Sequence, residues 1–146
     1  MKALGLDIGS VTVGIALSDS LKMFASAYSV IRYEEENDDL FKQIVDIIKK
    51  EDVDVVVVGM PYHMNGDFSL GCERTRRFEE KIKQLIDIEI VEIDETLMYR
   101  RKYNRGRLLN DVWIFGGICR EDGRVFAVVV ENRKEETLWD QILQHI

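Results

Sequence analysis

The sequence predicts an α/β fold, in which a mixed sheet of antiparallel and parallel strands is flanked by helices. Residues 2–8 and 11–18 are two apolar stretches joined by a tight turn, which is typical of a hairpin. Residues 53–59 contain an unbroken run of valines, which indicates a strand buried on both faces. Residues 37–50 and 69–86 repeat apolar side chains at helical spacing.

Two further strands complete the pattern. Residues 23–31 predict a third antiparallel strand, and residues 88–93 predict a strand that ends at the acid pair Asp94 and Glu95. The resulting element order is that of a ribonuclease H-like sheet, a three-stranded antiparallel meander extended by parallel strands through right-handed crossovers. In this arrangement the first strand lies beside the strand from residue 53, and ligand sites gather at the strand ends.

The composition fits one folded domain of a cytoplasmic protein. The chain has 146 residues, of which 46% are hydrophobic, and a single proline. Cys72 and Cys119 lack the spacing of a metal site or a disulfide framework, so we expect reduced thiols. No apolar run approaches the ~20 residues that cross a membrane, and Asp7 interrupts the apolar start, so neither an anchor nor a signal peptide is expected.

Charge is distributed unevenly along the chain. The net charge of −7 argues against a strong general affinity for nucleic acid. A local basic strip can still steer a phosphate backbone, although short basic runs are more commonly solvated loops. The basic groups are Arg74, Arg76 and Arg77 in one predicted helix, and Arg100, Arg101, Lys102, Arg105 and Arg107 after the last predicted strand.

Asp7 is the first candidate for a catalytic or metal-binding residue. It interrupts an otherwise apolar strand just before the turn at Gly9 and Ser10. A buried carboxylate is costly unless something compensates it, and the usual compensators are a metal ion or groups that face a phosphate. Asp7 therefore indicates chemistry on phosphates. The alternative is that Asp7 ends the strand and binds the amides of the turn.

Short motifs follow one another in a fixed order over the first two-thirds of the chain. They are Gly5-Leu6-Asp7-Ile8-Gly9-Ser10, Val13-Gly14-Ile15-Ala16-Leu17-Ser18-Asp19, Val57-Val58-Gly59-Met60-Pro61, Met64-Asn65-Gly66, Glu73-Arg74-x-x-Arg77-Phe78 and Asp94-Glu95-x-Leu97. In this order and spacing, residues 1–97 resemble the YqgF (RuvX) family of Holliday junction resolvases, which is also linked to processing of the small-subunit ribosomal RNA precursor.

The resemblance implies a divalent-metal-dependent nuclease that hydrolyses phosphodiester bonds in branched DNA or structured RNA. The cofactor would be Mg²⁺ or Mn²⁺, which prefer hard oxygen ligands, in a site that activates water and stabilises the leaving oxygen. The resemblance makes Asp7 one metal ligand and an acid of the Asp94 and Glu95 pair another, with Glu95 the closer match. Because adjacent strand residues face opposite sides, only one acid of this pair should face the metals.

The resemblance also implies contacts to the nucleic acid. Ser10, Asn65, Arg74 and Arg77 would hold its backbone, although both arginines could instead form ion pairs on the helix surface. The family's third ligand follows on a helix that is not evident in this sequence. Asp111 is the candidate catalytic acid that would stand in for it.

After Leu97 the chain departs from this family. The later motifs are Val91-Glu92-Ile93-Asp94-Glu95-Thr96, Arg101-Lys102-Tyr103-Asn104-Arg105-Gly106-Arg107, Val112-Trp113-Ile114-Phe115-Gly116-Gly117, Gly123-Arg124-Val125-Phe126-Ala127, Asn132-Arg133 and Glu136-Thr137-Leu138. They resemble the start of a DDE transposase domain of the Merlin-like insertion-sequence kind, in which Asp94 would be the first catalytic acid. A transposase-derived fragment is therefore one alternative function, and a non-catalytic module that binds nucleic acid or protein is another.

The tail extends the predicted fold by a C-terminal hairpin and helix. We expect residues 1–97 to form the ribonuclease H-like core, and residues 98–146 to pack on the same domain. The hairpin would pair residues 111–120 with 123–131, and the helix would begin near residue 134 and cover one sheet face. Its large aromatic residues need burial on the sheet or in a homodimer formed through the exposed hairpin edge. These residues are Trp113, Phe115, Phe126 and Trp139.

Overall fold

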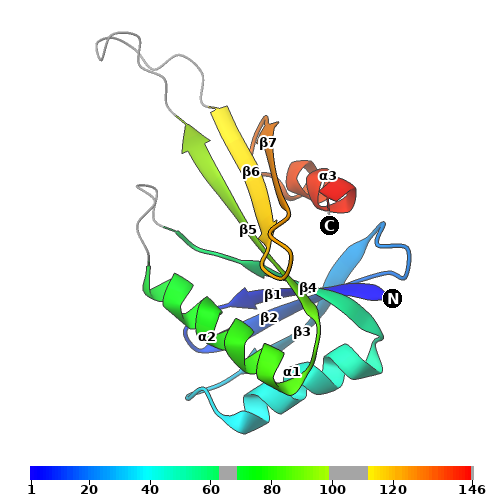
Figure 1. Ribbon diagram of the computed structural model, residues 1–146, viewed down its shortest axis with the longest axis vertical. Coiled ribbons are helices and arrows are strands. Elements are labelled where there is room, and N and C mark those ends of the chain that lie inside the picture. The colour runs from blue at the N-terminus through cyan, green and yellow to red at the C-terminus, as the bar shows by residue number, and fades with distance from the viewer. Residues whose placement is uncertain (63–68, 99–111, 146) are drawn as a thin grey trace.

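A computed structural model of the protein describes residues 1–62, 69–98 and 112–145 (Figure 1). In chain order its elements are β1 (Lys2–Ile8), β2 (Thr12–Ser18), β3 (Ala25–Arg32), α1 (Asp38–Lys50), β4 (Val53–Gly59), α2 (Leu70–Leu85), β5 (Glu89–Met98), β6 (Val112–Cys119), β7 (Val125–Val130) and α3 (Glu135–His145). The strands form one sheet in the order β3, β2, β1, β4, β5, β6, β7. This order confirms the predicted α/β class, a ribonuclease H-like mixed sheet with an added hairpin and helix.

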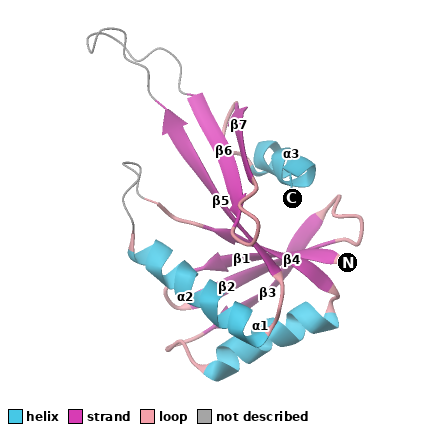
Figure 2. Ribbon diagram, in the orientation of Figure 1, coloured by secondary structure: helices cyan, strands magenta, loops and turns pink. Residues whose placement is uncertain are grey.

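The sheet combines two kinds of strand pairing. β1, β2 and β3 form the predicted antiparallel meander. β4 pairs in parallel with β1 on one side and with β5 on the other. The carboxyl ends of these parallel strands therefore lie at the same edge of the sheet, as Figure 2 shows.

The main core lies between the sheet and the helices α1 and α2. Leu4, Leu6 and Ile8 of β1 point into this core and contact a cluster that includes Ile44 of α1 and Phe78 of α2. Alternation sends the intervening residues of β1 to the opposite face. The valines of β4 are buried on both faces, as the sequence predicts.

Both main helices begin at side-chain caps. The Asn37 side chain accepts a hydrogen bond from the backbone N–H of Leu40, and the Ser69 hydroxyl accepts one from the N–H of Cys72. Each bond satisfies a donor that the first helical turn leaves unpaired. The two caps explain why the helices begin where the periodic apolar pattern begins.

β5 is longer than the sequence predicts. The predicted strand ends at residue 93, whereas the observed strand continues to Met98 because β6 pairs with it along this length. In that register Glu95 lies opposite Phe115, and Asp94 lies opposite Gly116. The acid pair is therefore inside a strand rather than beyond its end.

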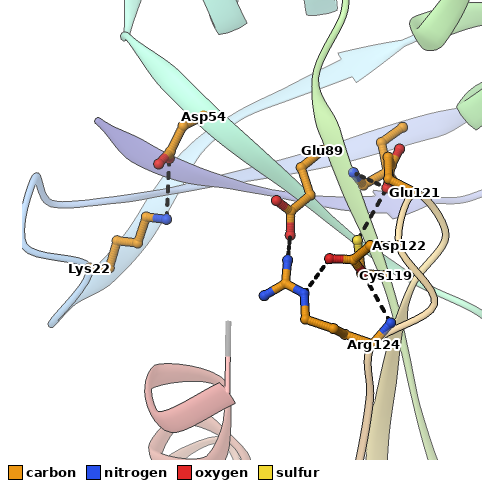
Figure 3. A network of polar contacts seen from close by, with 8 residues as sticks. Lys22, Asp54, Glu89, Cys119, Glu121, Asp122 and Arg124 are labelled. Carbon is orange, nitrogen blue, oxygen red and sulfur yellow. Dashed lines mark hydrogen bonds and ion pairs between the residues drawn. The ribbon is translucent and has the colours of Figure 1, made fainter.

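Polar contacts fix the turn between β6 and β7 (Figure 3). Gly123 has a φ of 74°, a left-handed conformation that favours glycine. Arg124 binds the carboxylate of Asp122 and, at 3.0 Å, that of Glu89 in β5. Glu121 accepts a hydrogen bond from a backbone N–H of β5. These contacts attach the predicted hairpin to the parallel part of the sheet.

α3 packs on the sheet face opposite α1 and α2. The indole N–H of Trp139 donates to the carbonyl oxygen of Met23 at 3.3 Å, and the ring of His145 stacks on Phe126 with centroids 4.7 Å apart. Of the aromatic residues expected to need burial, Phe115 is fully buried, whereas Trp113, Phe126 and Trp139 are half-buried. The helix thus covers part of this face.

The outer strand β7 keeps an exposed edge. Val125 and Val129 are both exposed to solvent. An unpaired strand edge of this kind can pair with another chain, so dimerisation through β7 stays a prediction.

Other expectations concern the cysteines and the membrane. Cys72 and Cys119 are free and buried, which agrees with the expected reduced thiols. In the part of the chain that the structure describes, no helix combines the length and the apolar character required to cross a bilayer.

We predict that Phe78→Ala destabilises the protein strongly. The Phe78 ring is fully buried and lies 4.9 Å from the ring of Phe41, so truncation leaves a cavity between both helices and the sheet. The expected loss in the free energy of unfolding is about 3–5 kcal/mol, measured by urea denaturation. The control is Val129→Ala, at an exposed position of β7, where a change below about 0.5 kcal/mol is expected. A loss below 1 kcal/mol for Phe78→Ala would contradict this account of the core.

Candidate active site

Asp7 lies near the carboxyl end of β1, on the face opposite α1 and α2. It is exposed, so the expectation of a buried carboxylate is wrong, because α3 leaves this part of the face open. The neighbouring strand presents Gly14 opposite Asp7, and a Cβ at Gly14 would lie 3.5 Å from the Asp7 Cβ. Among the described residues Asp7 has no hydrogen-bond or ion-pair partner. Its oxygens are therefore available to a ligand.

Glu95 lies on the same face as Asp7. Val91 and Ile93 of β5 pack with Ala3 of β1 on this face, and Glu95 follows Ile93 by two residues. Nη1 of Arg133 lies 3.6 Å from Oε1 of Glu95. Parallel pairing through β4 and alternation along β5 thus bring two acids to one face and one edge of the sheet.

Asp94 belongs to the opposite face, the one that α2 covers. It lines a cavity of about 310 Å³ together with Met60 of the loop after β4, Arg120 of the hairpin and the adjacent Glu95. Burial raises the pKa of Asp94 to about 6, an effect that a backbone hydrogen bond opposes and the charge of Glu95 reinforces. The alternation of β5 directs Asp94 away from the face that carries Asp7.

The two carboxylates on the shared face are of the chemical kind that binds a divalent ion. Mg²⁺ is usually bound by one or two carboxylates, with water and substrate phosphates completing its shell. Asp7 and Glu95 offer this hard-oxygen donor set. Within residues 1–62, 69–98 and 112–145, no cluster of three or more histidine, cysteine, aspartate or glutamate side chains suited to a metal occurs. Asp111, the candidate third acid, lies outside the described residues.

A groove of about 490 Å³ opens beside Asp7. Its lining consists mostly of small residues from β1, β2 and the β3 region, and it includes Trp139 of α3. The turn that follows β1 is fixed at this end, because the Tyr33 hydroxyl donates to the Gly9 carbonyl oxygen at 2.6 Å. Ser10 is exposed on this turn. The turn follows β1, and one strand, β4, separates β1 from the strand that carries Glu95. The groove and the turn leave room for an extended ligand next to Asp7.

The predicted basic contacts are only partly placed by the structure. Arg77 binds both oxygens of Glu36, at 2.7 and 3.0 Å, as the alternative of a surface ion pair predicts. Arg74 is half-buried, and its charge acts on Tyr33 and Glu36. Other predicted contacts lie outside the described residues, namely Asn65, Arg100, Arg101, Lys102, Arg105 and Arg107.

A buried acid network lies on the α2 face and was not expected from the sequence. Arg120 donates to both oxygens of Glu92 at 2.6 Å, and Glu92 is almost fully buried. Glu79 of α2 is buried beside them, and its Oε1 has no hydrogen-bond partner in the described structure. Burial, and then the charge of Glu92, raises the pKa of Glu79 to about 7. Glu92 is an acid within an otherwise apolar stretch of β5, two residues before Asp94. An acid within an apolar strand is also the pattern that makes Asp7 a candidate.

Comparisons with known proteins match the part of the chain that carries this face. The model of the RuvX family, described as a Holliday junction resolvase, matches residues 1–100. Relatives from Bacillus thuringiensis (strain Al Hakam) and Bacillus cereus (strain AH187), each named "Putative pre-16S rRNA nuclease", are 38% identical over 98 residues, which cover 66% of this chain and 72% of the relative. These matches confirm the first resemblance and do not favour the transposase-derived alternative.

One solved structure is a weaker match. YeaZ from Pseudomonas aeruginosa aligns with 88% of this chain and 68% of its own, with a TM-score of 0.40 and 11% identity. A likeness at this level supports no conclusion about the site.

We predict that the stability of the protein falls as pH rises from about 4.5 to about 7, and that Glu79→Gln removes part of this fall. The pKa of Glu79 is raised from 4.5 to about 7, so in this range the folded state keeps a proton that the unfolded state has released. Rising pH therefore lowers the free energy of unfolding, by at most on the order of 3 kcal/mol for this one group.

The measurement is urea denaturation of both proteins between pH 4.5 and 8. Glu80→Gln is the matched control, because Glu80 is the exposed neighbour of Glu79 on α2. Parallel pH profiles for the wild type and Glu79→Gln would contradict the assignment of the raised pKa to Glu79.

Proposed function

Because the chain belongs to the RuvX family, we propose that it is a nuclease whose active site is the face that carries Asp7 and Glu95. The observation that carries this proposal is the placement of two acids, 88 positions apart in the sequence, on one face and at one edge of the sheet. The bond cleaved would be a phosphodiester of a structured RNA or of branched DNA, the substrates that the names of the family and its relatives suggest.

The cofactor that we propose is Mg²⁺ or Mn²⁺, held by the carboxylates of Asp7 and Glu95. When bound, such an ion polarises a phosphate oxygen and lowers the pKa of a water molecule. Asp7 is suited to this role because it is exposed and, among the described residues, has no partner to release. Glu95 is suited because alternation directs it to the same face, whereas Asp94 is directed away.

Other residues of the chain would position the nucleic acid. Ser10 lies on the turn that Tyr33 fixes, so its hydroxyl and the neighbouring amides can donate to a backbone phosphate. The groove beside Asp7 offers Trp139 as an aromatic wall, and aromatic rings bind unpaired bases with little sequence preference. These features favour a substrate with an accessible strand rather than a continuous duplex.

We further propose that the tail and the family core form one domain. β6 pairs with β5 over eight residue pairs, and Trp139 of α3 binds the backbone of Met23 in the core. Separation of the tail would expose the apolar residues of both strands. A cytoplasmic location suits the proposal, because the buried free thiols of Cys72 and Cys119 stay reduced there.

We predict that Asp7→Asn lowers the rate of metal-dependent cleavage by at least about 100-fold, because it removes a charged ligand that provides several kcal/mol in the transition state. The assay uses a four-way DNA junction and a structured RNA, each with Mg²⁺ or Mn²⁺. Asp46→Asn is the control, since Asp46 is exposed on α1 on the far side of the sheet. Absence of cleavage by folded wild-type protein on both substrates would favour a non-catalytic nucleic-acid-binding role instead.

We predict that Glu95→Gln and Asp94→Asn have opposite outcomes in the same assay. Glu95→Gln should lower cleavage by at least about 100-fold, whereas Asp94→Asn should keep the rate within about threefold of the wild type, because its side chain lies on the other face. The two variants change adjacent residues by the same chemical step, so each controls for the other. Loss of cleavage in Asp94→Asn alone would place the metal on the α2 face and contradict the proposed site.

A further inference from the structure

Arg133 lies beside Glu95, between the end of β7 and the start of α3. Its Nη1 is 3.6 Å from Oε1 of Glu95, and its guanidinium carbon lies 4.5 Å from the centre of the Trp113 ring. Stacking on an indole holds a guanidinium in place through its flat face and leaves the N–H edges free. The Arg133 side chain is 57% exposed, so these edges are open to solvent.

The backbone around Arg133 is also held in place. The Asn132 side chain accepts hydrogen bonds from the N–H of Lys134, at 2.8 Å, and from the hydroxyl of Thr137, at 3.0 Å. This local turn connects β7 to α3. Arg133 thus lies on a defined turn between β7, a strand of the sheet, and α3, a helix that packs on the sheet.

Two arginine–glutamate pairs of this protein differ in the distance between their charged groups and in the burial of the glutamate. Arg120 and Glu92 form two hydrogen bonds of 2.6 Å, and Glu92 is buried, so that pair is closed. Arg133 and Glu95 lie 3.6 Å apart, beyond the usual length of a hydrogen bond between charged groups, and Glu95 is only half-buried. Among the described residues, Glu95 is the one acid paired with Arg133. The second pair therefore leaves most donors of its arginine unused.

We propose that Arg133 is a positioning residue that binds a backbone phosphate of the nucleic acid next to Glu95. The proposal rests on the active site proposed above. A guanidinium has five N–H donors, so Arg133 can remain beside Glu95 and still offer a two-pronged contact to phosphate oxygens. It would also offset the repulsion between the phosphate and the acids of this face, in a protein with a net charge of −7.

The proposal predicts a loss of one phosphate contact in Arg133→Gln. Affinity for a structured RNA should fall about tenfold, the usual effect of one hydrogen bond to a charged group. The slope of log affinity against log salt concentration should become shallower by about 0.7–0.9, which corresponds to one contact. In the cleavage assay KM should rise more than kcat falls.

The experiment measures binding by fluorescence anisotropy at several salt concentrations, in the presence of a metal chelator. Arg133→Lys should keep the slope, because the charge remains, but lose part of the affinity, because the fork of donors is gone. Arg124→Gln is the matched control, since Arg124 is an exposed, ion-paired arginine at the other end of β7. Thermal unfolding of each variant verifies that it is folded.

The outcomes separate this inference from the proposed nuclease site. If folded Arg133→Gln keeps the wild-type affinity and salt slope, the inference is overturned, even where Asp7-dependent cleavage is observed. If the slope changes for Arg133→Gln but not for Arg124→Gln, the phosphate contact is supported, even where the wild type cleaves neither substrate. An equal change in both variants would indicate a general charge effect and would also overturn the inference.

Discussion

The parallel pairing of β4 with both β1 and β5 is the constraint on which the rest of the structure depends. It brings the carboxyl ends of three strands to one edge, although those strands are separated by two helical crossovers. The four consecutive valines of β4, Val55–Val58, make this possible, because a strand segment enclosed on both faces needs apolar side chains on both. Without this strand between them, β1 and β5 would have no fixed relation, and Asp7 and Glu95 would share no face.

Register along β5 then decides which acid of the pair lies on the Asp7 face, where we propose the site. The side-chain period of a strand is two, so a shift by one residue would exchange Glu95 for Asp94 on the Asp7 face. The register is specified from both sides, by β4 and by β6. The buried pair of Glu92 and Arg120 on the α2 face opposes such a shift, because the shift would move a closed ion pair to the other face.

Local patterns were sufficient to predict most elements, but not the properties that depend on distant partners. The valine run of β4 and the capped apolar period of α1 act within a few residues, and both elements were predicted closely from the sequence. The end of β5 depends on β6, which follows later in the chain, so the local pattern predicts that end too early. Likewise, the exposure of Asp7 depends on how much of its face α3 covers, which the strand itself cannot reveal. The network of Glu79, Glu92 and Arg120 combines three elements, and only the acid within β5 carried a local signal.

The tail, residues 98–146, lies almost entirely beyond the family match. The match ends at residue 100, just beyond β5, so the matched part contributes both acids of the proposed site. The tail extends the sheet from β5 and returns as α3 over the face that carries those acids. In doing so it brings Arg133 next to Glu95. Two acids without a nearby cation would repel a phosphate backbone, whereas a cation set beside one of them favours its approach. In the proposed site, the tail therefore adds a cation to acids that come from the part of the chain shared with the family.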